Sequence, residues 1–132
     1  MSEIAEKLLR EIEEAERHYG VIQDFRKGAD YPLNTLREHM IGFKESLSKV
    51  RIWVAGWIKA VYGRDLELPI GDLPDKLNFC VFLIEADPQI APSGIRALLL
   101  VGQTKIEDVM AIVDAIKTMI MSERRRGESR EQ

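Results

Sequence analysis

The two histidines, His18 and His39, are the residues whose chemistry could matter most, because imidazole binds metals and exchanges protons near neutral pH. A carboxylate-bridged metal site in a helical bundle needs Glu-x-x-His on each of two helices. Here Glu14 lies four residues before His18, and Glu38 directly precedes His39. Neither spacing fits, so we expect no metal site and interpret both histidines as solvated or flanking the core.

Other catalytic arrangements are not found in the sequence. The nine glycines are too scattered to form a phosphate-binding loop, and no Cys–His or Ser–His–Asp set can be assembled. The single cysteine, Cys80, lies within the apolar run NFCVFLI, so it is interpreted as a small buried hydrophobe in a reducing compartment. We therefore expect no catalytic residue, no cofactor and no enzymatic activity.

Residues 96–113, RALLLVGQTKIEDVMAIV, superficially resemble a helix-turn-helix. A recognition helix needs bases and amides on its exposed side to meet phosphates and base edges. The second helix would instead expose Glu107, Asp108 and Asp114. This composition argues against sequence-specific reading of DNA by this segment.

Basic side chains support a weaker hypothesis of nucleic-acid binding. The net charge of the chain is −3, which argues against a dominant nucleic-acid partner. Residues 31–63 are nevertheless locally +3, and an arginine cluster follows residue 123. Sequence-independent phosphate contacts are therefore kept as an alternative function, with these candidates: Lys44, Lys49, Arg51, Arg124, Arg125, Arg126 and Arg130.

The longest regular pattern lies in residues 32–62, where apolar side chains recur after four and then three residues. This spacing places them on one side of a helix. Residues 2–27 show the same period and a net charge of opposite sign. The core stripe of the second helix consists of Leu36, Met40, Phe43, Leu47, Val50, Val54, Trp57 and Val61, and we expect its middle to be buried against Leu8, Ile12, Ala15 and Tyr19.

The lengths of these two segments predict an antiparallel hairpin. As helices, residues 2–27 would be about 39 Å long and residues 35–62 about 42 Å long, whereas a compact globule of this size is roughly 36 Å across. Ser2 can cap the first helix, and Gly28 and Gly63 are natural ends. Pro32 and the capping box TLRE from Thr35 are two possible starts for the second helix.

The second half of the chain predicts further helices after a connector at 64–72. Residues 77–84 could be a strand or part of a helix ending near Ala86, and the helix is favoured. A short helix from Ser93 should stop at Gly102, and the capping box TKIE should open a last helix over 104–122. The remaining residues 123–132 are almost wholly polar and should form a flexible tail.

These elements predict an all-α protein with one domain over residues 1–122: a hairpin (about 2–27 and 32–62), two shorter helices and a long C-terminal helix. Because residues 1–17 carry charges throughout, we expect no signal peptide, and no apolar run is long enough to span a bilayer. We expect a soluble, cytoplasmic protein with no membrane partner. Few Asn and Gln and many Glu, Lys and Arg are typical of thermophilic sources.

The helix at 32–62 is apolar on a second side as well as along its core stripe. Part of this second side could be covered by the helices after residue 73, or it could contact a partner chain. We interpret the protein as a non-catalytic interaction or assembly protein, self-associating as a dimer or acting as a small subunit of a larger complex. The candidate interface residues are Ile41, Ile52, Trp53, Gly56, Trp57 and Ala60.

Overall fold

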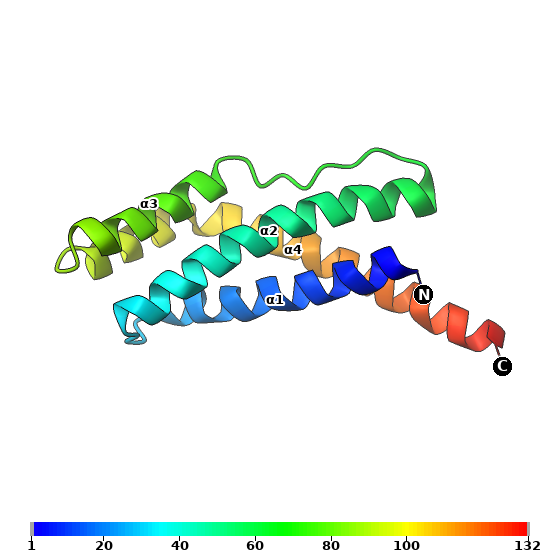
Figure 1. The fold of residues 1–132 in the computed structure, drawn as a ribbon, viewed down its shortest axis with the longest axis horizontal. Helices are drawn as coiled ribbons and strands as arrows, with labels where there is room; N and C mark the ends of the chain where they lie inside the picture. The colour runs from blue at the N-terminus through cyan, green and yellow to red at the C-terminus, as the bar shows by residue number, and fades with distance from the viewer. Residues whose placement is uncertain (1, 132) are drawn as a thin grey trace.

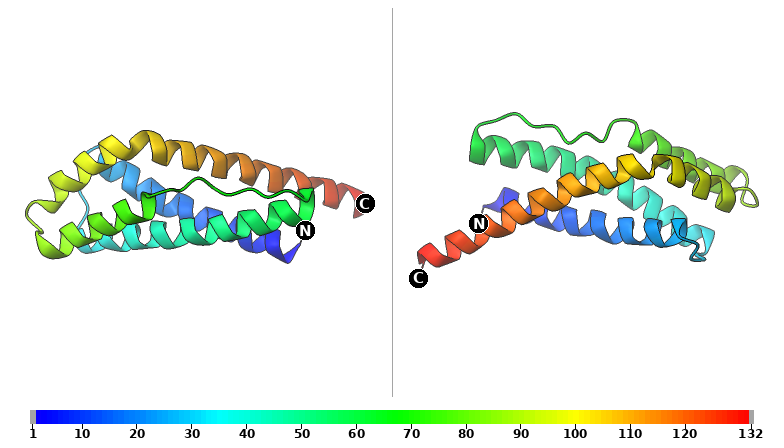
Figure 2. Two further views of the ribbon diagram at one scale, coloured as in Figure 1. Left: turned by 90° about the horizontal axis from the view of Figure 1, so that it is seen from above. Right: turned by 180° about the vertical axis from the view of Figure 1, so that it is seen from behind.

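The computed structural model describes the backbone of residues 2–131 and the side chains of residues 2–127. Within this described range the chain forms four helices: α1 (Glu3–Arg26), α2 (Leu33–Tyr62), α3 (Leu73–Ala86) and α4 (Ala91–Glu131). Figures 1 and 2 show an elongated bundle in which α1 and α3 run in one direction and α2 and α4 in the other. The all-α prediction is confirmed.

Local signals explain where the first two helices begin and end. Ser2 Oγ accepts a hydrogen bond from the backbone N–H of Ala5 at 3.2 Å, which caps α1 as expected. Of the two predicted starts for α2, the structure uses the earlier one, because Leu33 follows Pro32 directly. Gly63 ends α2 with a φ of 66°, a left-handed conformation that favours glycine.

The predicted hairpin and its core are confirmed. Phe43, Leu47, Val50 and Val54 are fully buried in one core with Leu8, Ile12 and Ala15. Tyr19 is partly buried, and its ring centroid lies 6.0 Å from that of Phe43. The core stripe ends earlier than expected, since Trp57 is buried but Val61 is exposed.

The bundle closes as a ring of neighbours, because α1 packs on α2, α2 on α3, α3 on α4 and α4 on α1. The ambiguous segment 77–84 lies within α3 and is helical. At only 14 residues, α3 is less than half as long as α2. The connector 63–72 therefore runs back along the second half of α2 in an extended conformation (Figure 1).

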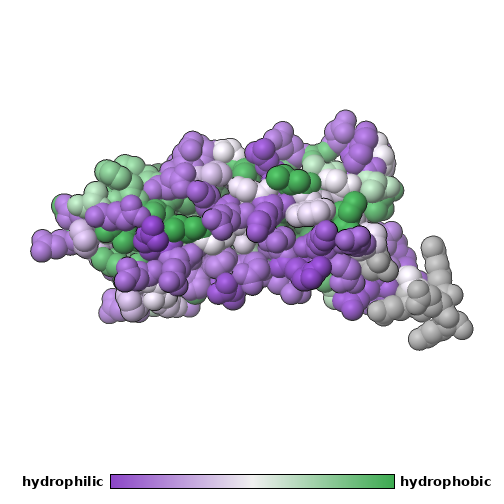
Figure 3. All heavy atoms as spheres, viewed as in Figure 1, coloured by the Kyte–Doolittle hydropathy of each residue, from purple (hydrophilic) through white to green (hydrophobic). Residues whose placement is uncertain are grey.

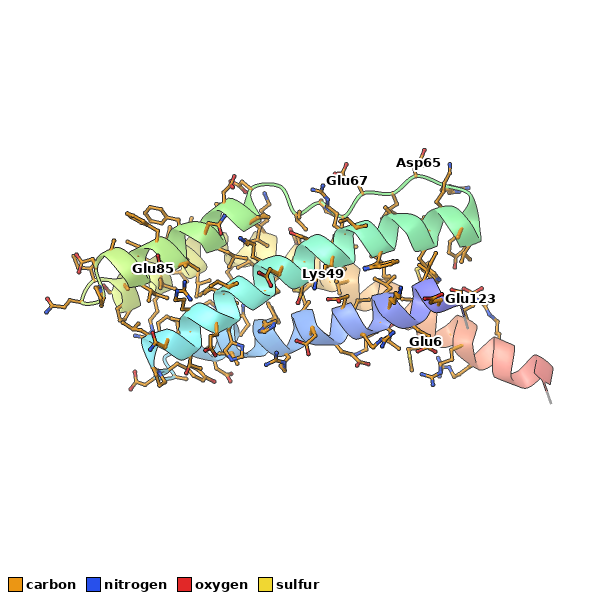
Figure 4. All side chains as sticks on the ribbon, in the orientation of Figure 1. Glu6, Lys49, Asp65, Glu67, Glu85 and Glu123 are labelled. Carbon is orange, nitrogen blue, oxygen red and sulfur yellow. The ribbon has the colours of Figure 1, made fainter. Side chains whose placement is uncertain are left out.

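Four side chains of the connector fix its path. Leu68 and Ile70 are buried in the core. Glu67 forms an ion pair with Arg51 at 3.9 Å, and Asp65 forms one with Lys59 at 3.3 Å (Figure 4). The connector thus supplies apolar side chains to the core where α3 does not reach, although it covers α2 more thinly than a helix would.

The predicted break at Gly102 is wrong, because α4 is one continuous helix of 41 residues. Gly102 occupies a buried core position in helical conformation, between Leu99 and Ile106. Buried residues therefore recur at the same helical spacing before and after Gly102. Packing along the whole helix outweighs the low helix propensity of one glycine. The capping box from Thr104 is not used as a helix start.

The predicted end of the last helix at residue 122 is also corrected, because residues 123–131 continue α4 as helix. Glu and Arg are good helix formers, and an existing helix extends more easily than a new one begins. Residue 132 and the side chains of residues 128–131 lie outside the described part of the structure.

Candidate functional site

The two histidines meet between α1 and α2. Their Nδ1 atoms lie 2.9 Å apart, so one ring must donate its N–H and the other must accept it. His18 is only 8 % exposed, whereas His39 is partly exposed. The interpretation of both residues as solvated or flanking is therefore corrected for His18. Gly42 makes room for its ring, since a Cβ at that position would clash with the imidazole.

The surroundings of His18 favour the neutral form of its imidazole. Burial is the main cause that lowers the pKa of His18, and the charges of Arg17 and His39 add to it. The Nε2 atom of His18 lies 3.6 Å from a carboxylate oxygen of Glu14. Among the described residues, no group of three or more His, Cys, Asp or Glu side chains is arranged to hold a metal ion.

Cys80 lies in the core of the bundle on α3. Burial raises the pKa of its thiol to about 11, so the reactive thiolate is scarce at neutral pH. The residue packs as a small apolar side chain.

The predicted interface residues divide into three groups by exposure. Trp57 is 2 % exposed and belongs to the core of the monomer, so it is not available to a partner. Ile41 and Trp53 are partly exposed, and the ammonium of Lys7 lies 5.3 Å from the centroid of the Trp53 ring. Only Ile52, Gly56 and Ala60 are exposed, with Ile52 at 66 %.

The exposed part of this second side is called the outer face of α2, and it consists of Glu45, Ser48, Lys49, Ile52, Gly56, Lys59 and Ala60. Acidic, basic and apolar side chains therefore lie together along one side of this helix. In Figure 4, Lys49 lies midway along α2, on the side away from the connector. The neighbouring helix α3 contacts the earlier part of α2, where Lys44 donates to Asn78 and Arg37 pairs with Glu85. Ile52 and the residues that follow it on this face stay uncovered.

A second set of exposed apolar side chains lies on α3 and the first half of α4 and was not predicted, and it is called the α3–α4 face. This α3–α4 face consists of Phe79, Phe82, Ile90, Leu100 and Val101, all exposed, with Val101 at 83 %. The rings of Phe79 and Phe82 lie 5.8 Å apart. Figure 3 shows hydrophobic residues gathered at the end of the molecule where α3 lies. The sequence signal that could have predicted this surface is the run NFCVFLI, which is apolar on two sides when it forms a helix.

The charged residues around the α3–α4 face are mainly acidic. Residues 72–108 contain six acidic and three basic side chains, giving −3. Lys105 and Lys76 both pair with Asp72. Asp75 and Asp108 are exposed, and neither forms an ion pair with another described side chain. A ligand of this surface would therefore be met by negative potential.

The basic candidates do not share one location. Lys44 and Lys49 lie on the middle of α2, while Arg124, Arg125 and Arg126 are exposed near the end of α4, beside Glu123 (Figure 4). Arg51 is exposed and pairs with Glu67. The side chain of Arg130 lies outside the described residues.

No helix within the described residues is long and apolar enough to cross a membrane. Comparison of the chain with protein-family models, with curated proteins and with solved structures finds no match.

Proposed function

We propose that this protein is a non-catalytic, cytoplasmic assembly protein that associates with a second copy of itself through the outer face of α2. The observation that supports this best is Ile52, a large apolar side chain left 66 % exposed in the middle of a long helix. The described helices pack on the other sides of α2, and none of the elements between residues 2 and 131 covers Ile52. Burial of apolar surface favours association, and a two-fold contact is the most common way to close it.

Light scattering of the wild-type chain over a concentration series tests this proposal. The expected result is a mass that rises with concentration from that of one chain towards that of two. A mass of one chain at every accessible concentration would contradict self-association.

The α3–α4 face supports a second role, as a small subunit in a complex with a different protein. Exposed apolar patches of this kind are uncommon on monomers that bind nothing. Its acidic surroundings disfavour a second copy of the same face, because like charges would meet. We propose that its partner presents an amphipathic helix with apolar anchors and basic flanks.

A fluorescein-labelled model helix with leucines on one face and lysines on the other is the probe for this surface. Its fluorescence anisotropy should rise on addition of the protein and rise much less with Phe82→Lys. The matched control replaces each lysine of the probe with glutamate and should not bind. Equal binding of both probes would contradict the proposed partner chemistry.

Sequence-independent nucleic-acid binding is the alternative function. Its support is the group of three consecutive exposed arginines, Arg124 to Arg126. Such arginines would contact phosphates through charge alone, so the affinity for nucleic acid should decrease steeply as the salt concentration rises. Filter binding at low and at moderate salt separates this function from protein assembly.

A further inference from the structure

Charged side chains are placed symmetrically about Ile52 on the outer face of α2. Glu45 lies seven residues before Ile52, and Lys59 lies seven residues after it. Seven residues are close to two helical turns, so all three side chains lie on the same side of the helix. All three are exposed. The face therefore carries Glu45 at one end, Ile52 in the middle and Lys59 at the other end, with a further positive charge, Lys49, one turn before Ile52. Antiparallel pairing places Lys49 opposite the uncharged residue 55 of the second copy, whereas parallel pairing would place it opposite Lys49.

This pattern complements itself in one orientation. In an antiparallel pair of α2 helices with Ile52 on a two-fold axis, Glu45 of each copy faces Lys59 of the other. In a parallel pair, Glu45 would face Glu45 and Lys59 would face Lys59, which is unfavourable. We infer that the protein forms an antiparallel two-fold dimer in which the outer faces of α2 meet at Ile52. This inference rests on the proposed self-association and specifies its geometry.

Small side chains leave space for the second helix beside Ile52. Ser48 and Gly56 lie four residues to either side of it, and both are exposed. Nothing lies within 4 Å of the place where a Cβ on Gly56 would stand. The helix axes can therefore come close enough for the two Ile52 side chains to pack against each other.

The two charged groups can make the contact, because neither is held in a buried ion pair, although the charge of Glu45 also acts on His18 and raises its pKa. Glu45 forms no ion pair with another described side chain. Lys59 pairs with Asp65 at 3.3 Å, and the Asp65 side chain is 94 % exposed. Such an exposed pair contributes little to stability. Lys59 can therefore exchange Asp65 for Glu45 of a second copy at small cost.

Disulfide crosslinking tests the orientation. Antiparallel pairing about Ile52 places residue 48 of one copy beside residue 56 of the other, whereas the two copies of residue 48 stand about eight residues, or 12 Å, apart along the helix. A disulfide needs Cα atoms within about 7 Å. The variants are Ser48→Cys and Gly56→Cys, one of them with an affinity tag so that mixed dimers differ in mass.

Under mild oxidation, the mixture of the two variants should crosslink several-fold faster than either variant alone. Ile52→Cys, on the two-fold axis, should crosslink with itself. The wild-type chain is the matched control, because its only thiol, on Cys80, is buried and should form no crosslinked dimer.

Parallel pairing would give the opposite pattern, with each variant crosslinking to itself at least as fast as to the other, and would overturn the inference. The inference is also overturned if none of the cysteine variants crosslinks although light scattering shows a dimer, because another surface must then form the contact. A monomer at all concentrations would overturn the proposed self-association, and the geometry with it. The two failures are therefore distinguishable.

Discussion

At the residue scale, the His18–His39 pair links the hairpin to pH. A hydrogen bond between two imidazoles needs one ring to accept, so it is lost when both rings are protonated. Protonation of His18 is further disfavoured by burial, which lowers its pKa in the folded state. The unfolded chain, with an ordinary histidine pKa of about 6.5, binds a proton there more readily.

Acidification should therefore destabilise the fold. Because the unfolded state binds more protons below about pH 6.5, the free energy of unfolding should decrease as the pH falls through this value and continue to decrease towards the lower pKa of folded His18. Chemical denaturation at a series of pH values measures this dependence.

The matched variant is His18→Gln, which keeps a polar side chain but cannot titrate. Its stability should change less between pH 7.5 and 5.5 than that of the wild-type chain. An equal change in the two proteins would mean that His18 does not cause the pH dependence. Glu14 and Asp72, whose pKa values are lowered by hydrogen bonds to Arg17 and Lys105, act in a separate and more acidic range.

The fully buried Leu47 tests the core stripe itself. Leu47→Ala should lower the free energy of unfolding by about 2–5 kcal/mol, because it removes buried methyl groups and leaves a cavity. Its neighbour Ser48 is exposed, so Ser48→Ala should change stability by less than about 0.5 kcal/mol. Similar losses in both variants, measured by denaturant titration, would contradict the assignment of the stripe to the core.

At the element scale, the end of α2 at Gly63 was predictable from the sequence, whereas the continuity of α4 through Gly102 was not. Gly63 ends α2, and the next positions at the spacing of the core stripe, Arg64 and Asp65, are charged and exposed. Gly102 lies in a core stripe that does continue, through Leu99, Ile106 and Val109. A glycine permits a helix end without requiring one, so the decision depends on tertiary packing that local sequence does not contain.

The two glycines give opposite predictions for substitution by alanine. Gly102 is helical and nothing lies within 4 Å of a Cβ placed there, so Gly102→Ala should stabilise the protein by about 0.5–1 kcal/mol. Gly63 has a φ of 66°, so Gly63→Ala should destabilise it. Thermal unfolding compares the two variants. A loss of stability in Gly102→Ala would indicate that α4 is interrupted there.

At the scale of the whole molecule, the short third helix determines which surfaces stay exposed. The second apolar side of α2 was recognisable from sequence, but its coverage depends on where α3 lies. Because α3 contacts only the earlier part of α2, Ile41 is partly covered and Ile52 is not. Trp57 could not be separated from the interface set by periodicity, since it lies at the edge of the core stripe.

The α3–α4 face was missed for a related reason. Phe79 and Phe82 lie in the same short run as the buried Leu77, Cys80 and Ile84, so all of them could be interpreted as core. Only the three-dimensional arrangement separates the buried side of α3 from the exposed one.

The central claim, that the outer face of α2 joins two copies of the chain, is tested most directly by light scattering of Ile52→Lys beside Val101→Lys. Each variant places a lysine at a highly exposed apolar position on a helix, but only Ile52 lies on the proposed contact. We expect both variants to unfold like the wild-type chain at low concentration. At high concentration Val101→Lys should remain a dimer and Ile52→Lys should have the mass of one chain. A dimer of Ile52→Lys as stable as the wild-type dimer would contradict the claim.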